Sequence, residues 1–517
     1  MDLKISRETV PASVSIFDGI QEQSVELDYI LPDYYPDIFR LVRCEVTPVI
    51  TEWAVNGDRL TYGLRCDIRI LYCGEGDSLL RCITQTQSFQ KTAELGRSCE
   101  QPEIRLVPKT DHINFRAVNK RRLDIRGAVS VKVSVTCESP QEVVSGVSGM
   151  NMQLQRTPVK FASKKLTAEK LLRISEETEL SAAQPSVSSI ICCRCSLSEC
   201  ERKLISGKLL AKGDAEIDLL YSCEKDGTGA VEQMRFSLPY SQIIDIDGID
   251  DTYECTVVPE VISCEVTPAA GREGDNRLLR CELELRLLCR CIRSSTVMVG
   301  TDAYSTVYPC EVAMSGIEAE QIPSVYSESF RHSAKLAEGD SVPANIYAVW
   351  CTPKNINTRI GEDGRSVVIS GMLTYSMAVK DSSGMISIPD KDETFEEMLT
   401  IGDDISRSLV SADITTKDVS FNISSDGILT ARSEIAARIS AKGSSQLRAV
   451  TDITVDSSAK KERDGDYAIK LYFGVPDEDV WDIAKRYSTS VSAIMEENEL
   501  DGERLRSGGM LLIPIVT

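Results

Sequence analysis

The sequence predicts a mainly β protein, in which three tandem sandwich- or barrel-like domains precede one small domain of βααβ order. Apolar and polar residues alternate with period two in runs such as Val129 to Val135, which is the pattern of a half-buried strand. Turn signals rich in glycine and aspartate, such as Asn56-Gly57-Asp58, separate these runs. One set of markers then recurs three times, which indicates a repeated domain.

Four markers define the repeats, in the same order each time. The first marker is a proline that precedes a cysteine by eight residues, and the second is a glycine that ends a strand signal. The third is an isolated phenylalanine, and the fourth is an arginine that stands two residues before an acidic residue. The markers are Pro36, Cys44, Gly63, Phe89 and Arg122 in the first repeat, Pro185, Cys193, Gly207, Phe236 and Arg280 in the second, and Pro343, Cys351, Gly371, Phe395 and Arg432 in the third. We therefore assign repeat 1 to residues 1–150, repeat 2 to 151–325 and repeat 3 to 326–455, and expect one shared fold.

Other features of the repeats carry further expectations. Helix is expected only between repeats, near Leu166 to Ile174. The three repeated cysteines are expected to be buried in equivalent strands, and the three repeated arginines to make ion pairs within their domains or to lie at strand edges. The pentapeptide Cys-Glu-Val-Thr-Pro occurs at 44–48 and at 264–268, out of register with the repeats, which half-unit duplication or coincidence would explain.

The C-terminal segment predicts a separate small domain. A polar stretch at 456–465 is typical of a linker, and residues 466–517 follow it as the last domain. A short alternating strand opens this domain, and a helix follows in which Val480, Ile483 and Tyr487 share one face. A second short helix from Val491 to Glu497 and an apolar strand from Met510 to Ile515 complete it.

This βααβ order resembles a LysM domain. The first helix carries Trp481-Asp482-Ile483-Ala484 and the last strand carries Leu511-Leu512-Ile513-Pro514, which are anchors of that family in the right order. LysM is a non-catalytic recognition module, so the resemblance implies a binding function.

Composition excludes several classes of partner. At 517 residues the chain is long enough for roughly three to four domains. A net charge of −21 argues against nucleic acid and anionic membrane surfaces as partners. No apolar stretch approaches the ~20 residues that span a bilayer, and the first residues lack a signal-peptide core, so a cytoplasmic protein is expected. In a reducing compartment, the 18 cysteines are expected to be thiols rather than bridges.

Three β repeats followed by a LysM domain resemble the SPOCS (spore coat protein) repeat family, and in particular its SipL-type coat morphogenetic members. The opening Leu31-Pro32-Asp33-Tyr34-Tyr35-Pro36-Asp37-Ile38 is similar to a recurrent start of these proteins. The resemblance implies a location in the mother cell, at the forespore surface. It also implies that the protein helps a SpoIVA-type coat-scaffolding ATPase to encase the spore, with LysM as the docking module.

Two sets of LysM residues are candidates for binding. A protein-binding site is expected at Lys470, Tyr472, Phe473, Asp477, Glu478 and Asp479, with either aromatic ring as the anchor and the other packed in the core. A glycan groove is the alternative, at Pro476, Asp477, Asp479, Asn498 and Leu500. Common LysM sequences have Gly-Asp-Thr or Gly-Asp-Ser in this loop, whereas Pro476 and Glu478 replace the glycine and the hydroxyl residue here. The domain has ten acidic against five basic residues, which favours a partner protein with a basic patch.

Neither a catalytic nor a metal site is expected. The two histidines, His112 and His332, lie in different repeats, and no phosphate loop or hydrolase motif occurs. Cys192-Cys193-Arg194-Cys195 and Cys289-Arg290-Cys291 lie in strand-like segments, where alternate residues simply share a face. Structural thiols are favoured over a metal site and over regulated oxidation or cross-linking, and no cofactor is expected.

The first hypothesis is therefore a non-enzymatic, cytoplasmic scaffold of the spore coat that docks through its LysM domain to a SpoIVA-type ATPase. The alternative is a peptidoglycan- or cortex-binding LysM protein that recognises N-acetylglucosamine glycans. A hydrolase with a LysM anchor is a third class, for which no repeat shows a catalytic constellation.

Overall fold

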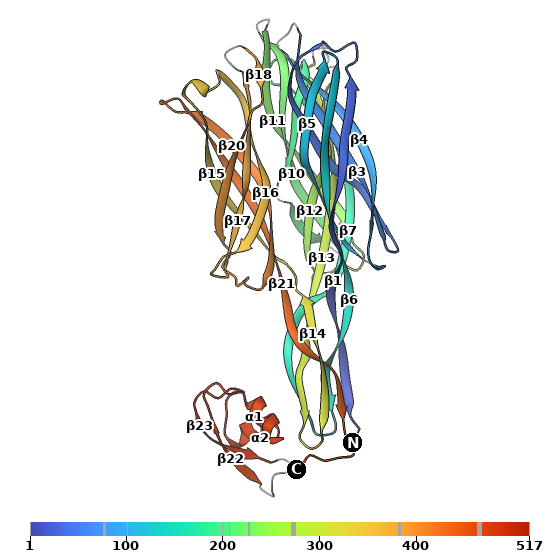
Figure 1. Ribbon diagram of the computed structural model, residues 1–517, viewed down its shortest axis with the longest axis vertical. Helices are drawn as coiled ribbons and strands as arrows, with labels where there is room; N and C mark the ends of the chain where they lie inside the picture. The colour runs from blue at the N-terminus through green and yellow to red at the C-terminus, as the bar shows by residue number, and fades with distance from the viewer. Residues whose placement is uncertain are drawn as a thin grey trace.

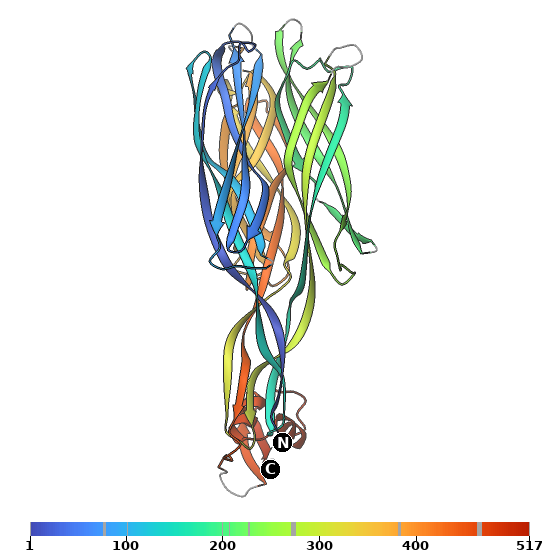
Figure 2. The same ribbon diagram turned by 90° about the vertical axis from the view of Figure 1, so that its right-hand side faces the viewer.

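The computed structural model describes residues 2–75, 79–100, 102–198, 200–205, 207–225, 228–269, 276–380, 384–462 and 468–515. Three β-sandwich units stand side by side at one end of an elongated molecule (Figure 1). Below them, paired strands continue into a narrow stalk, and the small C-terminal domain lies beside the far end of that stalk (Figures 1 and 2). The predicted fold class, mainly β with a βααβ end, is confirmed.

Unit 1 shows the common plan. Its strands are β1 (Lys4–Ile30), β2 (Ile38–Asn56), β3 (Arg59–Gly74), β4 (Leu80–Glu94), β5 (Glu103–Asn119) and β6 (Arg122–Ser148). The first, sixth and fifth strands form one antiparallel sheet, in the order β1-β6-β5, and the other three form a second, in the order β2-β3-β4. Residues such as Val25, Leu64 and Val129 fill the space between the two sheets, so the unit is a sandwich.

Units 2 and 3 repeat this plan. The strands of unit 2 are β7 (Met152–Glu179), β8 (Ser189–Leu197), β9 (Glu201–Ile205), β10 (Lys208–Lys225), β11 (Thr228–Asp245), β12 (Glu254–Ala269) and β13 (Leu278–Ser305). Those of unit 3 are β14 (Cys310–Glu320), β15 (Ser324–Glu338), β16 (Asn345–Ile360), β17 (Ser366–Lys380), β18 (Ile386–Ser387), β19 (Asp390–Thr400), β20 (Ser408–Ile423) and β21 (Ile428–Val455), with a 3-10 turn at Gly339–Ser341. The sheets are β7-β13-β12 and β8-β10-β11 in unit 2, and β15-β21-β20 and β16-β17-β19 in unit 3. The expectation of one shared fold therefore holds in strand order.

The second sheet of each unit is covered on both faces. Its inner face packs in its own sandwich, and part of its outer face contributes to a central core shared by all three units. That core contains Leu71 and Leu80 from unit 1, Ile191 and Leu220 from unit 2, and Trp350 from unit 3. Burial on both sides explains why the regular alternation of β3 gives way to a continuous buried run at its end.

The stalk is formed by the strands that extend beyond the sandwiches. Strands β1 and β6 are 27 residues long, and β7, β13 and β21 are 28. Beyond the sandwiches, β1 pairs only with β6, β7 with β13, and β14 with β21. Apolar side chains from all three pairs, including Val10, Phe161, Val299, Ile317 and Ala449, form the stalk core.

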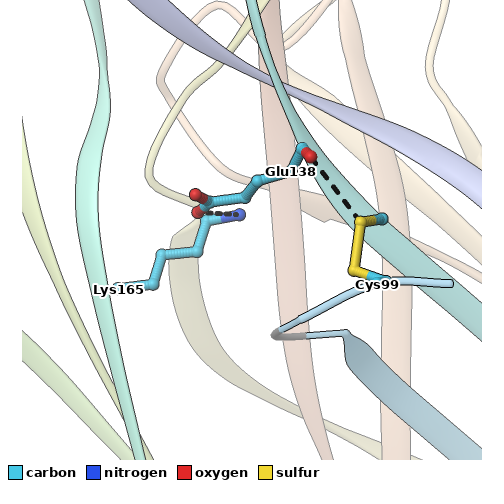
Figure 3. Close-up of a disulfide and its surroundings, with 4 residues drawn as sticks. Cys99, Glu138 and Lys165 are labelled. Atoms are coloured by element: carbon cyan, nitrogen blue, oxygen red, sulfur yellow. Dashed lines mark hydrogen bonds and ion pairs between the residues drawn. A yellow bond between two sulfur atoms is a disulfide. The ribbon is translucent and has the colours of Figure 1, made fainter. Parts of the chain in front are cut away.

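Charged residues from all three units meet where the sandwiches end and the stalk begins. The Glu320 carboxylate, only 6% exposed, lies 2.7 Å from Lys165, 2.8 Å from Lys442 and 3.5 Å from Arg290. Lys165 also lies 3.9 Å from Glu138 of unit 1. We call this group, together with Glu103, which is 2.8 Å from Arg290, the waist cluster. Figure 3 shows Lys165 reaching across to Glu138.

The one disulfide among the 18 cysteines lies beside the waist cluster. Cys99, in the segment before β5, is bonded to Cys137 of β6 (Figure 3). The expectation of thiols throughout is wrong for this pair, because the segment returns alongside β6 and brings the two Cα atoms to 6.1 Å, within reach of a disulfide. The other 16 cysteines are thiols.

The helix predicted near Leu166 to Ile174 is wrong, because this segment lies within β7. Leu166, Ala168, Leu172 and Ile174 all face the core of unit 2, which is the period of a strand. Pairing with β13 along the whole segment overrides the helical preference of its lysine and leucine residues.

Some of the repeat markers occupy equivalent positions in the three units, and others do not. Cys44, Cys193 and Cys351 lie in β2, β8 and β16, the equivalent second strands, but only Cys351 is fully buried and the other two are half-buried. Gly207 is not equivalent to Gly63 and Gly371. In unit 2 the second strand is split into β8 and β9, and Gly207 takes the positive φ (77°) of the turn that joins β9 to β10.

The repeated arginines make ion pairs in two units. Arg122 pairs with Asp28 across β1 and β6, and Arg280 lies 2.9 Å from Glu177 across β7 and β13. The repeated pentapeptide lies in β2 in one copy and in β12, the fifth strand of its unit, in the other.

We predict that Glu320→Gln lowers the free energy of unfolding by about 3 kcal/mol, because three cations then lose their most buried counter-charge. Urea unfolding followed by circular dichroism measures this loss. Glu318→Gln, an exposed position on the same strand, is the control and should change stability by less than about 0.5 kcal/mol. Equal effects of the two substitutions would contradict the role given to the waist cluster.

Candidate functional site

The C-terminal domain folds as β22 (Ile469–Gly474), α1 (Val480–Tyr487), α2 (Val491–Glu497) and β23 (Gly509–Pro514). The side chain of Asp479 accepts a hydrogen bond from the Trp481 amide (2.9 Å), and so caps the N-terminus of α1. Ser490 caps α2 in the same way, through the Ala493 amide. The two strands pair antiparallel, and the helices cover one face of this small sheet.

Tyr472 and Phe473 point to opposite faces of β22. The Tyr472 hydroxyl donates to Glu478 (2.6 Å) and accepts from Arg486 (3.1 Å), and its ring packs edge-on against Tyr487. The hydrogen bond to Glu478 raises the pKa of Tyr472. Tyr472 and Glu478 therefore belong to the internal structure of the domain, whereas Phe473 is 68% exposed.

Phe473 is part of a larger apolar surface. Ile469, Leu471 and Phe473 share the outward face of β22, and their neighbours across the pair are Pro514, Leu512 and Met510 of β23. Leu471 and Met510 are as exposed as Phe473. We call Ile469, Leu471, Phe473, Met510 and Leu512 the outer sheet face. Sequence reasoning missed its leucines and methionine, although the alternate apolar residues Ile469, Leu471 and Phe473 of β22 and the continuous apolar run of β23 indicate a second apolar face.

Most residues of the expected glycan groove have structural partners. The Asn498 side-chain amide donates to the carbonyls of Ile494 (2.8 Å) and Leu512 (2.7 Å), and its oxygen accepts from the Leu512 amide (2.7 Å). Leu500 packs against the core of the domain, and Asp479 is the helix cap. Pro476 and Asp477 are exposed, although the Asp477 amide donates to the carbonyl of Leu505 (2.8 Å).

The loops on either side of this groove are joined to each other. The Val480 amide donates to the backbone carbonyl of Glu503 (2.8 Å), and the Leu505 amide donates to the backbone carbonyl of Glu478 (3.0 Å). The remaining expected binding residue, Lys470, lies over the ring of Tyr487, on the helix side of the sheet. The structure thus separates the expected residues: Phe473 lies on the outer sheet face, and the others lie at its rim or inside the domain.

The domain is attached to the end of the stalk through α1. The Trp481 indole donates to Asp302 (2.9 Å), and Lys485 lies 2.6 Å from the same carboxylate. Tyr304, also at the end of β13, donates its hydroxyl to the carbonyl of Thr489 (2.8 Å) and packs edge-on against Trp481. Tyr304 is 2% exposed and belongs to the core of the C-terminal domain.

Residues 456–462, the part of the predicted linker that the structure describes, are also bound to the end of the stalk. The Lys461 amide donates to the carbonyl of Val307 (2.8 Å), and its ammonium group donates to the carbonyl of Ser305 (2.7 Å). Burial lowers the pKa of Lys461. Residues 463–465 of that linker, and 466–467 of the predicted domain, lie outside the described residues.

Comparison with family models gives two matches. Residues 186–268, which run from before β8 into β12, match the model described as SipL, SPOCS domain. Residues 475–514 match the LysM domain model. The chain carries a SPOCS domain and a C-terminal LysM domain. These two matches agree with the resemblance to SipL-type proteins that the sequence showed. Searches of curated proteins and of solved structures found no match.

The SPOCS and LysM domains fit a sporulation coat protein with peptidoglycan-binding capacity. In the part of the chain that the structure describes, no three His, Cys, Asp or Glu side chains are placed to hold a metal ion. Neither of the two described α-helices has the length and apolar content that crossing a membrane requires.

We predict that Asp302→Ala loosens the attachment of the LysM domain to the stalk, because α1 loses both the indole hydrogen bond and the lysine ion pair and only the contacts of Tyr304 and Lys461 remain of those described. Small-angle X-ray scattering of the full chain should show a larger radius of gyration and a more flexible profile. Asp482→Ala, an exposed position on α1 itself, serves as the control and should leave the profile unchanged. A profile of Asp302→Ala that matches the unsubstituted protein would show that other contacts hold the domain.

Proposed function

We propose that this chain is a non-enzymatic assembly protein of the spore coat, and that its LysM domain docks it to a SpoIVA-type coat-scaffolding ATPase. The proposed place is the mother-cell side of the forespore surface. The SPOCS and LysM matches support the assignment to the coat, and the family resemblance supplies the partner. The outer sheet face is the observation that supports a protein, rather than a glycan, as the partner.

This surface has the character of a protein-binding site. It places Leu471, Phe473 and Met510, each about two-thirds exposed, side by side on two paired strands. A soluble domain gains nothing from such a patch on its own, and contiguous exposed apolar groups mark interaction surfaces. An aromatic residue flanked by aliphatic side chains is a common energetic centre of an interface.

Charge defines the partner further. The LysM domain is acidic, and two of its basic residues are already engaged, since Lys485 pairs with Asp302 and Arg486 contacts Tyr472. Asp477, three residues after the end of β22, is exposed. A partner with an apolar pocket bordered by basic residues therefore complements the surface in shape and in charge.

The attachment of the domain agrees with this proposal. The stalk end contacts α1, whereas the outer sheet face lies on the side of the sheet away from the helices. The docking surface thus stays accessible while the domain is held to the rest of the chain.

Glycan binding is the second candidate, favoured by the LysM match itself. Its groove would rest on the exposed Pro476 and Asp477, because Asp479, Asn498 and Leu500 have roles inside the domain. A neutral glycan gains nothing from the acidic charge of the domain. The two candidates share Asp477 but otherwise use different surfaces, so substitutions at Leu471 and Phe473 on one side and at Pro476 on the other can separate them.

Replacing Leu471 and Phe473 together with Ala should weaken binding of the full chain to the SpoIVA-type ATPase by about 2 kcal/mol or more, because the apolar centre of the interface is removed. Isothermal titration calorimetry with the purified ATPase measures this change. Leu409→Ala, at a highly exposed leucine in β20, is the control and should bind normally. Normal ATPase binding by the double variant, or tight binding of chitin-type oligosaccharide that Pro476→Ala weakens, would favour the glycan function.

Neutralising the rim charge should act on the rate of association. Asp477→Asn keeps a residue that tolerates the positive φ (64°) of this position, and removes one charge. We expect slower association with the ATPase at low salt and a difference that shrinks as salt is added, while dissociation changes little. Surface plasmon resonance at several ionic strengths tests this, and a difference that does not depend on salt would contradict electrostatic steering.

A further inference from the structure

Two thiols in unit 2 lie in contact across the open edge of the sandwich. Cys193 is in β8 and Cys264 is in β12, and their sulfur atoms are 3.5 Å apart. Each strand is at the edge of its sheet, so no backbone ladder joins them. The thiols of Cys195 and Cys281 lie near enough to Cys264 to influence its pKa.

The same position is different in the other units. Cys351, the equivalent of Cys193 in unit 3, has the hydroxyl groups of Thr416, Ser433 and Tyr375 around it instead of thiols. In unit 1, the fifth strand β5 contains no cysteine that could face Cys44. A thiol facing the repeated cysteine from the fifth strand is therefore a feature of unit 2, and a packing role common to all units does not require it.

We propose that Cys193 and Cys264 are an oxidation site, at which a peroxide forms a disulfide that joins the two sheets of unit 2. The thiolate of one cysteine attacks the peroxide, which cleaves the O–O bond and gives a sulfenic acid and hydroxide. The second thiol attacks the sulfenic sulfur, the S–S bond forms and water leaves. In total, two thiols and one hydrogen peroxide give one disulfide and two water molecules.

The geometry suits this chemistry better than it suits a metal. The two sulfurs are already in contact, so closing the bond requires a shift of about 1.5 Å. Both residues are half-buried, which leaves them accessible to a small oxidant. No metal-binding group of three or more ligands is found among the described residues, which include all four of these thiols.

The disulfide would stiffen two contacts at once. It would bridge residues 71 positions apart in the sequence, which restricts the unfolded chain. It would also fix β12 next to its bulge between Val261 and Ser263, where the carbonyl of Ile262 accepts a hydrogen bond from Arg65 of unit 1 (2.6 Å). Oxidation in unit 2 is therefore expected to strengthen its attachment to unit 1.

The test is oxidation of the full chain by hydrogen peroxide, followed by alkylation and non-reducing peptide mass spectrometry. We expect a linked pair of peptides that contains Cys193 and Cys264, and the loss of two of the 16 free thiols. The midpoint of thermal unfolding should rise, and dithiothreitol should reverse the rise. Contact with Cys264 and burial raise the pKa of Cys193, so the thiolate is scarce at neutral pH and bond formation should be faster at pH 9 than at pH 7.

Cysteine-to-serine variants distinguish the Cys193–Cys264 disulfide from pairings with the neighbouring thiols. Cys193→Ser and Cys264→Ser should each abolish the linked peptides and the rise in midpoint. Cys281→Ser, which removes another thiol near Cys264, should retain both. The proposal is wrong if Cys193 and Cys264 are alkylated separately after oxidation, or if either is found linked to Cys195 or Cys281 instead.

Discussion

Three cations converge on the carboxylate of Glu320 at the point where the sandwiches end and the stalk begins. They come from units 2 and 3, and unit 1 contributes Glu103 and Glu138 to the same group. The buried carboxylate of Glu320 is costly unless it has charged partners, so the cluster favours an arrangement of the units that brings these cations to it. The cluster thus joins the three units at the point where their long strand pairs continue into the stalk.

From this junction the stalk leads to the LysM domain. Strand β13 starts in the sandwich of unit 2, passes the waist cluster at Arg290, and ends with Asp302 and Tyr304 against α1. One continuous strand therefore connects the packing of the units with the placement of the recognition module. The outer sheet face is left free by this arrangement, as the proposed docking of a partner protein requires.

The sequence predicts much of this fold because its signals are local. The helix face of Val480, Ile483 and Tyr487 and the closing apolar strand predict the LysM domain element by element, and the repeated markers predict three units of one fold. What it does not predict depends on distant residues. The segment near Leu166 has a helical composition and becomes a strand only because β13 pairs with it. The attachment of Trp481 to Asp302 joins residues 179 apart and leaves no periodic pattern in the sequence.

The candidate site shows the same limit. An aromatic pair on β22 predicts an anchor, but only the register with β23 shows that Phe473 lies outside with Leu471 and Met510, while Tyr472 lies inside with Glu478. Asn498 is a polar residue in a suitable loop for glycan, and the structure uses its amide to hold Leu512 and Ile494.

Hydrogen–deuterium exchange of the full chain, with and without the SpoIVA-type ATPase, tests the central claim most directly. The account predicts that the ATPase protects residues 469–475 and 509–512, which include the outer sheet face, and leaves α1 unchanged. Protection confined to the loops at 476–479 and 498–505, or none within the LysM domain, would contradict it.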